Sequence, residues 1–209
     1  MTTQTPFHLA VITAGVTEPS STRLLADRLT EATVRALARH DVGEVVVEVV
    51  DVRDVAHDVT NNVLTGFASP ELQVRLDAIA EADAVVVATP VYAASYSGLF
   101  KMLVDVLPKD ALRDTPVLLG ATGGTARHSL AIDHALRPLF AHLGALVAPV
   151  AVFAASEDWG SVDAGRLGER IERAGKAFAT LVTGSAREPR IDPFEDVTPF
   201  ESLLSDLRT

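Results

Sequence analysis

The chain of 209 residues has no cysteine, which excludes disulfide bridges, thiolate metal sites and a cysteine nucleophile. No apolar run approaches the roughly 18–20 residues that a membrane-spanning helix needs. The first residues, MTTQTPFHLAVITAG, lack a basic leader, so no signal peptide is evident. The 6 histidines are scattered without the spacing of metal ligands. We therefore expect a cytoplasmic protein with no membrane span and no metal site.

Positive charge is also scarce, with 18 Lys and Arg against 28 Asp and Glu and a formal net charge of −10. Nucleic-acid binding depends on clustered Lys and Arg that neutralise phosphates, so no nucleic-acid partner is expected. Acidity keeps a protein soluble and identifies no partner by itself. The length and the 48% hydrophobic content are sufficient to bury a core without covalent cross-links.

Apolar, mostly β-branched runs recur at residues 8–13, 45–52, 84–90, 116–122 and 146–154. Most of them are continuous rather than alternating, as in parallel strands that are buried on both faces. The second run contains Glu48 and Asp51 and is typical of an edge strand.

Helical patterns fill the gaps, including one over residues 69–83 with Ser69 as N-cap and Pro70 at the first helical position. This alternation predicts a flavodoxin-like α/β three-layer sandwich around a five-stranded parallel sheet of order 2-1-3-4-5. The Rossmann fold is the alternative, but it normally needs a sixth strand and a G-x-G-x-x-G turn. We expect this domain to span residues 1–184 and residues 185–209 to form a C-terminal extension.

Ligands of an open parallel sheet bind beyond the carboxyl ends of the strands, where the strand order reverses. The relevant turns are AGVTEPSSTRLL, TPVYAASYSG and ATGGTARHS. In the first turn, Ser20, Thr22 and Arg23 lie at the start of a helix, whose free N–H groups and positive dipole end can hold a phosphate. The alternative is an ordinary helix cap with spare hydroxyls.

The second and third turns suit a flat ligand. Both tyrosines of the chain, Tyr92 and Tyr96, fall in the second turn, where they cover either the sheet end or a bound ring. In the third, residues 122–124 allow backbone N–H groups to approach a ring closely, or form a flexible connection. A phosphate at the first turn and a planar polar ring between the other two would together correspond to flavin mononucleotide (FMN).

The segments TPVYAASYSGLFKMLVDVLP and ATGGTARHSLAIDHALRPLFAHLGA resemble NAD(P)H-dependent FMN reductases, over roughly residues 7–182. The resemblance is strongest to the reductases that supply reduced flavin to two-component alkanesulfonate-type monooxygenases. It implies FMN and NAD(P)H as cofactors, a homodimer or homotetramer in which a neighbouring subunit closes the site, and a monooxygenase partner. It also implies FMN-binding residues at the three turns, namely Ser20, Thr22, Arg23, Pro90, Val91, Tyr92, Ser95, Thr122, Gly123 and Gly124.

One departure from this family concerns the phosphate. The first turn of the family usually reads Gly-Ser-x-Arg, whereas this chain has Gly15-Val16-Thr17-Glu18. Glu18 adds negative charge near a dianion, with Arg23 as the possible substitute for the missing arginine. We therefore expect FMN to be retained weakly, as in a reductase whose flavin leaves as a product.

The helix SLAIDHALRPLFAHL contains Pro138, which donates no hydrogen bond and whose ring crowds the carbonyl of His134. A π-bulge around His134 would relieve this conflict, and the related reductases resemble this arrangement near a subunit interface. A simple kink with His134 at a polar surface is the alternative.

No protein acid or base is required for hydride transfer between nicotinamide and flavin, because the cofactors carry the chemistry. Lys101 and Asp105 are therefore expected to form a surface ion pair. Two other functions remain open: an FMN-retaining reductase of quinones, azo dyes or metal oxyanions, and a flavodoxin-type electron carrier. Carriers usually sandwich the flavin between aromatic rings, whereas the small residues 93–95 leave one ring face open.

Overall fold

A mainly parallel β-sheet forms the middle of the molecule in the computed structural model, which describes residues 5–160 and 164–184. The expected extension, residues 185–209, lies outside this part. The strands run in the order β2-β1-β3-β5, with β6 and β7 both pairing in parallel with β5. Their bounds are β1 Phe7–Thr13, β2 Val45–Asp51, β3 Ala84–Tyr92, β5 Pro116–Gly123, β6 Leu146–Val147 and β7 Val152–Ala155.

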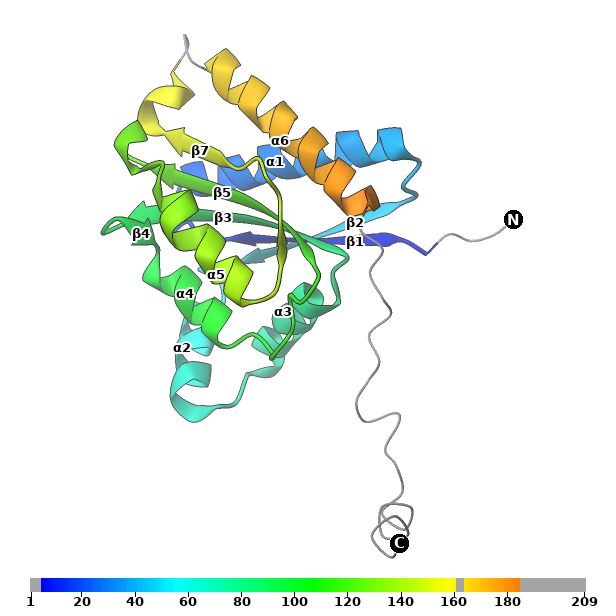
Figure 1. Ribbon diagram of the computed structural model, residues 1–209. Helices are drawn as coiled ribbons and strands as arrows, with labels where there is room; N and C mark the ends of the chain where they lie inside the picture. The colour runs from blue at the N-terminus through cyan, green and yellow to red at the C-terminus, as the bar shows by residue number, and fades with distance from the viewer. Residues whose placement is uncertain (1–4, 161–163, 185–209) are drawn as a thin grey trace, which may run out of the picture.

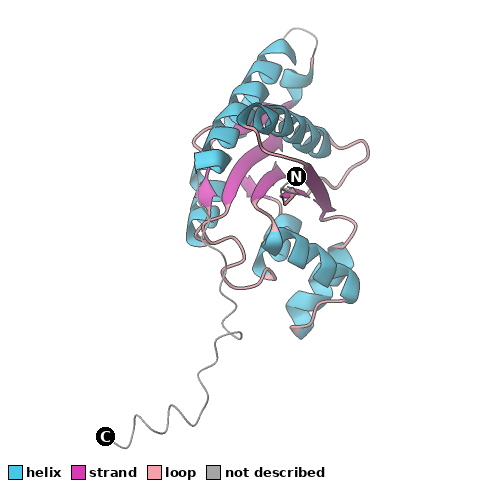
Figure 2. Ribbon diagram, turned by 90° about the vertical axis from the view of Figure 1, so that its right-hand side faces the viewer, coloured by secondary structure: helices cyan, strands magenta, loops and turns pink. Residues whose placement is uncertain are grey.

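Helices cover both faces of this sheet (Figure 1). One face carries α1 (Ser21–Leu37) and α6 (Ala164–Gly184), and the other carries α2 (Ala56–Thr65), α3 (Pro70–Glu81), α4 (Gly98–Asp105) and α5 (Arg137–His142). Figure 2 shows the sheet edge-on between the two helical layers. The predicted three-layer flavodoxin-like sandwich is therefore confirmed, and β2 is the predicted edge strand.

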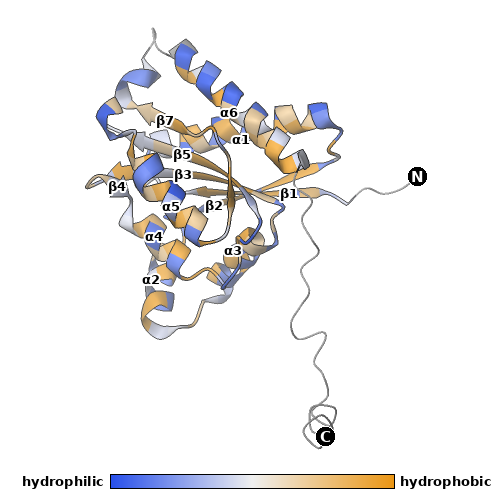
Figure 3. Ribbon diagram, in the orientation of Figure 1, coloured by the Kyte–Doolittle hydropathy of each residue, from blue (hydrophilic) through white to orange (hydrophobic). Residues whose placement is uncertain are grey.

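Each helical layer encloses a separate apolar core. Leu25, Leu29 and Phe178 lie over one face of the sheet, and Phe100 and Phe140 lie over the other. In Figure 3 the central strands are mainly hydrophobic, whereas the helices carry hydrophilic residues on their outer sides. None of the helices within the described ranges has both the length and the hydropathy to cross a membrane.

The fifth predicted strand is divided into β6 and β7, because the chain leaves the sheet around Pro149. The guanidinium of Arg137 fills this gap by donating to the carbonyls of Ala148 and Pro149, at 2.8 and 2.9 Å. The sequence analysis also missed α2, since only Val59 of this helix is fully buried and its apolar pattern is short. The predicted helix after Ser69 is present, with the Ser69 hydroxyl accepting the N–H of Leu72.

Of the two alternatives for this helix, the structure has the π-bulge, as a π-helical turn, η3 (Ile132–Leu136), directly before α5. The N–H of Arg137 donates to the carbonyl of Ile132, five residues earlier. This wider turn accommodates Pro138, which has no N–H for the carbonyl of His134. His134 itself is exposed.

The contact between α1 and α6 requires a residue without a side chain at Gly175. A Cβ atom there would lie 2.8 Å from the carbonyl carbon of Ala32 and 3.0 Å from its oxygen. We predict that Gly175→Ala lowers the free energy of unfolding by about 1–3 kcal/mol, the usual cost of overpacking.

Gly168→Ala, on the same helix, is the matched control. No atom lies within 4 Å of a Cβ at Gly168, so helix propensity should make this variant neutral or more stable by up to about 1 kcal/mol. Urea unfolding followed by circular dichroism measures both variants. Equal unfolding midpoints would contradict the tight α1–α6 contact.

Candidate functional site

The carboxyl ends of β1, β3 and β5 lie along one edge of the sheet, as the predicted strand order requires. In the register of these strands, Thr13 is the neighbour of Ala88, and Pro90 is the neighbour of Thr122. The three turns that follow are therefore brought together. Thr22 of the first turn and Thr122 of the third are 100 positions apart, so the parallel topology is what brings these turns to one edge.

The first turn ends in a capped helix N-terminus. Ser20 is the N-cap of α1, and its hydroxyl accepts the N–H of Arg23 at 3.1 Å. The carbonyl of Ser20 accepts the N–H of Leu24. Within the described part of the chain, the N–H groups of Ser21 and Thr22 have no partner. Free N–H groups at a helix start, together with its dipole, favour an anion.

A hydrogen bond connects the first turn to the third. The hydroxyls of Thr22 and Thr122 lie 2.7 Å apart, and both residues are buried. The structure therefore brings these two predicted site residues into contact. Each hydroxyl is the hydrogen-bond partner of the other. This contact fixes the position of the first turn relative to the third.

Arg23 points toward the end of β2. Its guanidinium contacts Asp27 at 2.8 Å and lies 3.9 Å from Asp51, the last residue of that strand. Burial, the largest effect, raises the pKa of the Asp51 carboxyl above its ordinary value. A second arginine, Arg53, follows β2 and forms an ion pair with Glu18 of the first turn.

The sequence analysis missed Arg53. Arg53 and Glu18 are separated by 35 positions in the chain, so no local pattern pairs them. One feature could have indicated this residue: Arg53 follows the strand that pairs with β1, so it lies at the same carboxyl edge of the sheet as the first turn.

The second turn is a tight β-hairpin that the sequence analysis did not predict. β3 folds back onto the short strand β4 (Ser95–Tyr96), pairing Val91 with Tyr96 and Tyr92 with Ser95. Its two central residues, Ala93 and Ala94, have φ angles of 48° and 66°. Such a turn normally uses Asn or Gly, and each alanine costs about 1–2 kcal/mol in this left-handed region.

Buried polar groups hold the base of this hairpin. The hydroxyl of Thr89 accepts the N–H of Ser97 at 3.2 Å, and Ser97 caps α4 by accepting the N–H of Phe100. The hairpin tip is open to solvent, with Tyr92 50% exposed. The ring of Tyr96 instead packs edge-on against Phe100, at 5.9 Å between centroids. The two tyrosines therefore differ in their surroundings. Their rings do not lie on opposite sides of a space that could hold a flavin ring.

The third turn contains Gly123, which lies against the ring of Phe153 of β7. A Cβ at position 123 would lie 2.9 Å from the Phe153 ring. The end of β7 is held in turn by Asp158, which accepts the N–H of Ala155 at 2.8 Å and pairs with Arg170. Gly124 is exposed and has open space around it.

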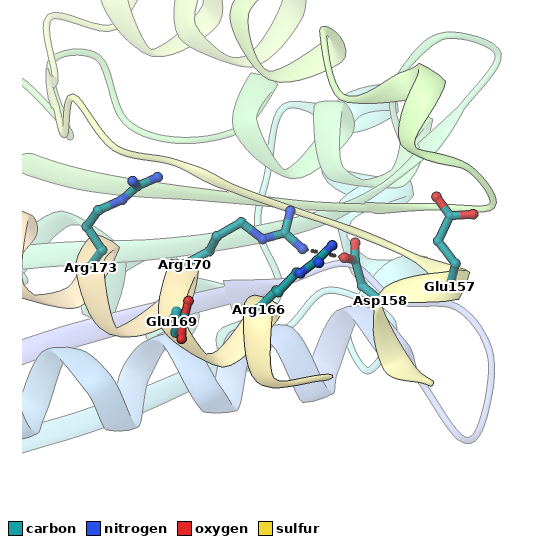
Figure 4. A pocket seen from close by; sticks show the side chains of 6 residues that line it. All are labelled: Glu157, Asp158, Arg166, Glu169, Arg170 and Arg173. Atoms are coloured by element: carbon teal, nitrogen blue, oxygen red, sulfur yellow. Dashed lines mark hydrogen bonds and ion pairs between the residues drawn. The ribbon is translucent and has the colours of Figure 1, made fainter. Parts of the chain in front are cut away.

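A cavity of about 690 Å³ lies beside this strand end, between η4 (Ser156–Trp159) and α6 (Figure 4). Among the described residues, its lining side chains are all charged, with three of each sign: Glu157, Asp158, Arg166, Glu169, Arg170 and Arg173. This lining does not suit a flat aromatic ring, and none of the predicted site residues belongs to it. Its charged side chains include Asp158, which holds the end of β7.

The sequence analysis also made predictions about one ion pair and about metal sites. Lys101 and Asp105 form the expected ion pair on the exposed side of α4. Within residues 5–160 and 164–184, no three His, Asp or Glu side chains gather in a set that could hold a metal ion.

The Thr22–Thr122 contact can be tested by removing one hydroxyl at a time. Thr22→Val preserves the shape of the side chain but leaves the buried Thr122 hydroxyl without its partner. We predict a loss of about 1–3 kcal/mol in the free energy of unfolding. The Thr122→Val variant should behave similarly, and the double variant should cost less than the sum of the two. Urea unfolding of the four proteins gives the coupling, and strictly additive losses would contradict the hydrogen bond.

The comparisons with known proteins agree with this geometry. Residues 7–160 match the family model of NADPH-dependent FMN reductases. An FMN reductase (NADPH) from Pseudomonas aeruginosa is 38% identical over 181 residues, covering 86% of this chain and 94% of the relative. The NADH-dependent FMN reductase SfnE from Pseudomonas putida is 37% identical over 179 residues, covering 85% and 93% of the two chains.

Solved structures give the same result. An oxidoreductase from Corynebacterium diphtheriae superimposes with a TM-score of 0.83 at 39% identity, covering 88% of this chain and all of that one. The apo form of an NADH:FMN oxidoreductase, EmoB, superimposes with a TM-score of 0.68 at 27% identity, covering 88% and 92% of the two chains. The chain therefore belongs to the NADPH-dependent FMN reductase family of oxidoreductases, as the sequence resemblance implied.

Proposed function

We propose that this protein is an NAD(P)H:FMN oxidoreductase that binds FMN across the three turns at the carboxyl edge of its sheet. The observation that carries the proposal is the convergence of a helix start with free N–H groups, an exposed hairpin and a glycine turn. These features fit the three parts of FMN: an anionic phosphate, a flat ring and a polar ring edge. The family membership supports the same cofactor.

In this proposal, Ser20, Thr22 and Arg23 serve the phosphate. The N–H groups of Ser21 and Thr22 are the direct donors, because the Ser20 hydroxyl is occupied by the helix cap and the Thr22 hydroxyl by Thr122. Arg23 supplies positive charge at the same helix start. The loss of the family's Gly-Ser-x-Arg arginine makes this the weakest part of the site.

The ring lies against the hairpin and the glycine turn. Pro90, Val91, Tyr92 and Ser95 line the isoalloxazine, and Thr122, Gly123 and Gly124 meet its pyrimidine edge. Because Ala93 and Ala94 carry only methyl groups at the exposed tip, one face of the ring stays open for nicotinamide. FMN supplies the hydride acceptor, and the protein contributes stacking, hydrogen bonds and exclusion of water.

We further propose a cytoplasmic homo-oligomer that passes reduced FMN to a separate monooxygenase. The support is the sequence resemblance, together with the poor match between the first turn and a tightly held phosphate. In the same family, the relative SfnE from Pseudomonas putida is an NADH-dependent FMN reductase.

Anaerobic mixing of NADPH or NADH with the purified protein, with and without excess FMN, tests this function. We expect the visible absorbance of the whole FMN excess to be lost, since the flavin turns over as a substrate. Loss from bound FMN alone would identify an FMN-retaining reductase, and no loss with either nucleotide would identify an electron carrier. Both of these outcomes contradict the proposal, and retention of FMN through extensive dialysis would contradict its release as a product.

The π-helical turn offers a second test of the proposed assembly. We expect His134→Ala to alter FMN release or the size of the oligomer, because η3 precedes α5 and π-bulges often occur at functional sites. His142→Ala, on the regular helix α5, is the control and should leave both unchanged. Sizing with light scattering and stopped-flow flavin release provide the measurements. Wild-type oligomer size and kinetics in His134→Ala would leave the π-helix with a purely local role.

A further inference from the structure

The phosphate end of the proposed FMN site carries an ion-pair cluster with an excess of negative charge. The cluster contains two arginines, Arg23 and Arg53, and the carboxylates of Glu18, Asp27 and Asp51. Asp54 is a further carboxylate that acts electrostatically on Asp51 and Arg53. Both arginines are thus neutralised by carboxylates of the chain itself.

Arg53 reaches this site from the turn after β2. Its backbone N–H donates to the Asp51 carboxylate at 3.2 Å, and its guanidinium extends to Glu18, two residues before the N-cap of α1. The guanidinium therefore contacts a carboxylate of the first turn, two residues before the helix start where the phosphate is proposed to bind. The resemblance alone did not indicate this cation.

Glu18 and Asp51 hold the two arginines in different ways. The side chain of Asp51 is 14% exposed and accepts a backbone N–H, so it is fixed within the fold. The side chain of Glu18 is 75% exposed, and its recorded partner in the described part of the chain is Arg53. An exposed pair of this kind is weak and can be exchanged at little cost. Glu18 is therefore the carboxylate that an incoming phosphate can displace.

We propose that Glu18 competes with the FMN phosphate for Arg53, which makes Arg53 a phosphate-binding residue and Glu18 the residue that weakens FMN binding. This inference rests on the proposed function, since it concerns the same FMN site. When FMN binds, the Glu18 carboxylate leaves the guanidinium and turns to solvent, and a phosphate oxygen takes its place. When FMN leaves, Glu18 returns and neutralises Arg53, which favours release.

The exchange has a consequence for specificity. Riboflavin has the same ring as FMN but no phosphate, so its binding gains nothing from Arg53 and loses nothing to Glu18. With Glu18 present, Arg53 adds little to the affinity for the phosphate, and the preference for FMN over riboflavin depends on the N–H groups at the start of α1. Removing the Glu18 charge should increase this preference.

The test compares the dissociation constants of FMN and riboflavin for the full-length wild type and for Glu18→Gln, measured by quenching of flavin fluorescence. We expect Glu18→Gln to tighten FMN binding by about five- to tenfold, as for a charge-assisted contact at a partly exposed site. Riboflavin binding should not change. Adding Arg53→Gln to Glu18→Gln should abolish the gain.

Glu31→Gln is the matched control, because Glu31 forms an exposed pair with Arg35 on the same helix α1. It removes the same charge away from the site and should leave both constants unchanged. An equal gain in Glu31→Gln, an equal gain for riboflavin, or unchanged FMN binding in Glu18→Gln would overturn the inference while leaving the proposed function intact. Wild-type protein that binds neither flavin and bleaches neither with NAD(P)H would overturn both.

Discussion

The hydrogen bond between the hydroxyls of Thr22 and Thr122 joins the start of α1 to the end of β5 across the centre of the sheet. It depends on the parallel register that places β1, β3 and β5 side by side. A buried hydroxyl pair tolerates little displacement, because separating the two groups would leave both without a partner. The contact therefore sets the position of the helix start relative to the glycine turn, which are the two ends of the proposed FMN site.

The hairpin between these two turns is built on a different principle. Its base is fixed by Thr89 and Ser97, whereas its tip accepts two alanines in left-handed conformations. Unfavourable backbone conformations of this kind persist where the surrounding structure enforces them, often at functional sites. Asparagine or glycine would relieve the conformation, but glycine would also loosen the tip. Alanine combines a defined backbone with a side chain too small to cover a ring.

The sequence was sufficient for the order of the main strands and for the three turns that meet at their carboxyl edge. Continuous apolar runs identify the buried strands, and the strand order alone selects the three turns. The π-helical turn was also predictable, since Pro138 conflicts with a regular helix at a specific carbonyl. The hairpin was not predictable because Ala93-Ala94 is no turn signature, and the Glu18–Arg53 pair joins two separate turns. Local patterns report on the backbone, whereas a binding site depends on which side chains meet between elements.

At the proposed phosphate end, the charge balance accounts for a family member that departs from the usual first turn. Where the family has an arginine, this chain has Glu18, but the fold supplies Arg53 from the neighbouring strand end. The positive charge of Arg53 is thus present, but it is neutralised by the carboxylate of Glu18. In the proposed site, binding of FMN then depends mainly on the contacts to the ring and on the backbone N–H groups at the start of α1. In the proposed function the flavin leaves after each reduction, and a cation whose charge is neutralised by Glu18 favours that release.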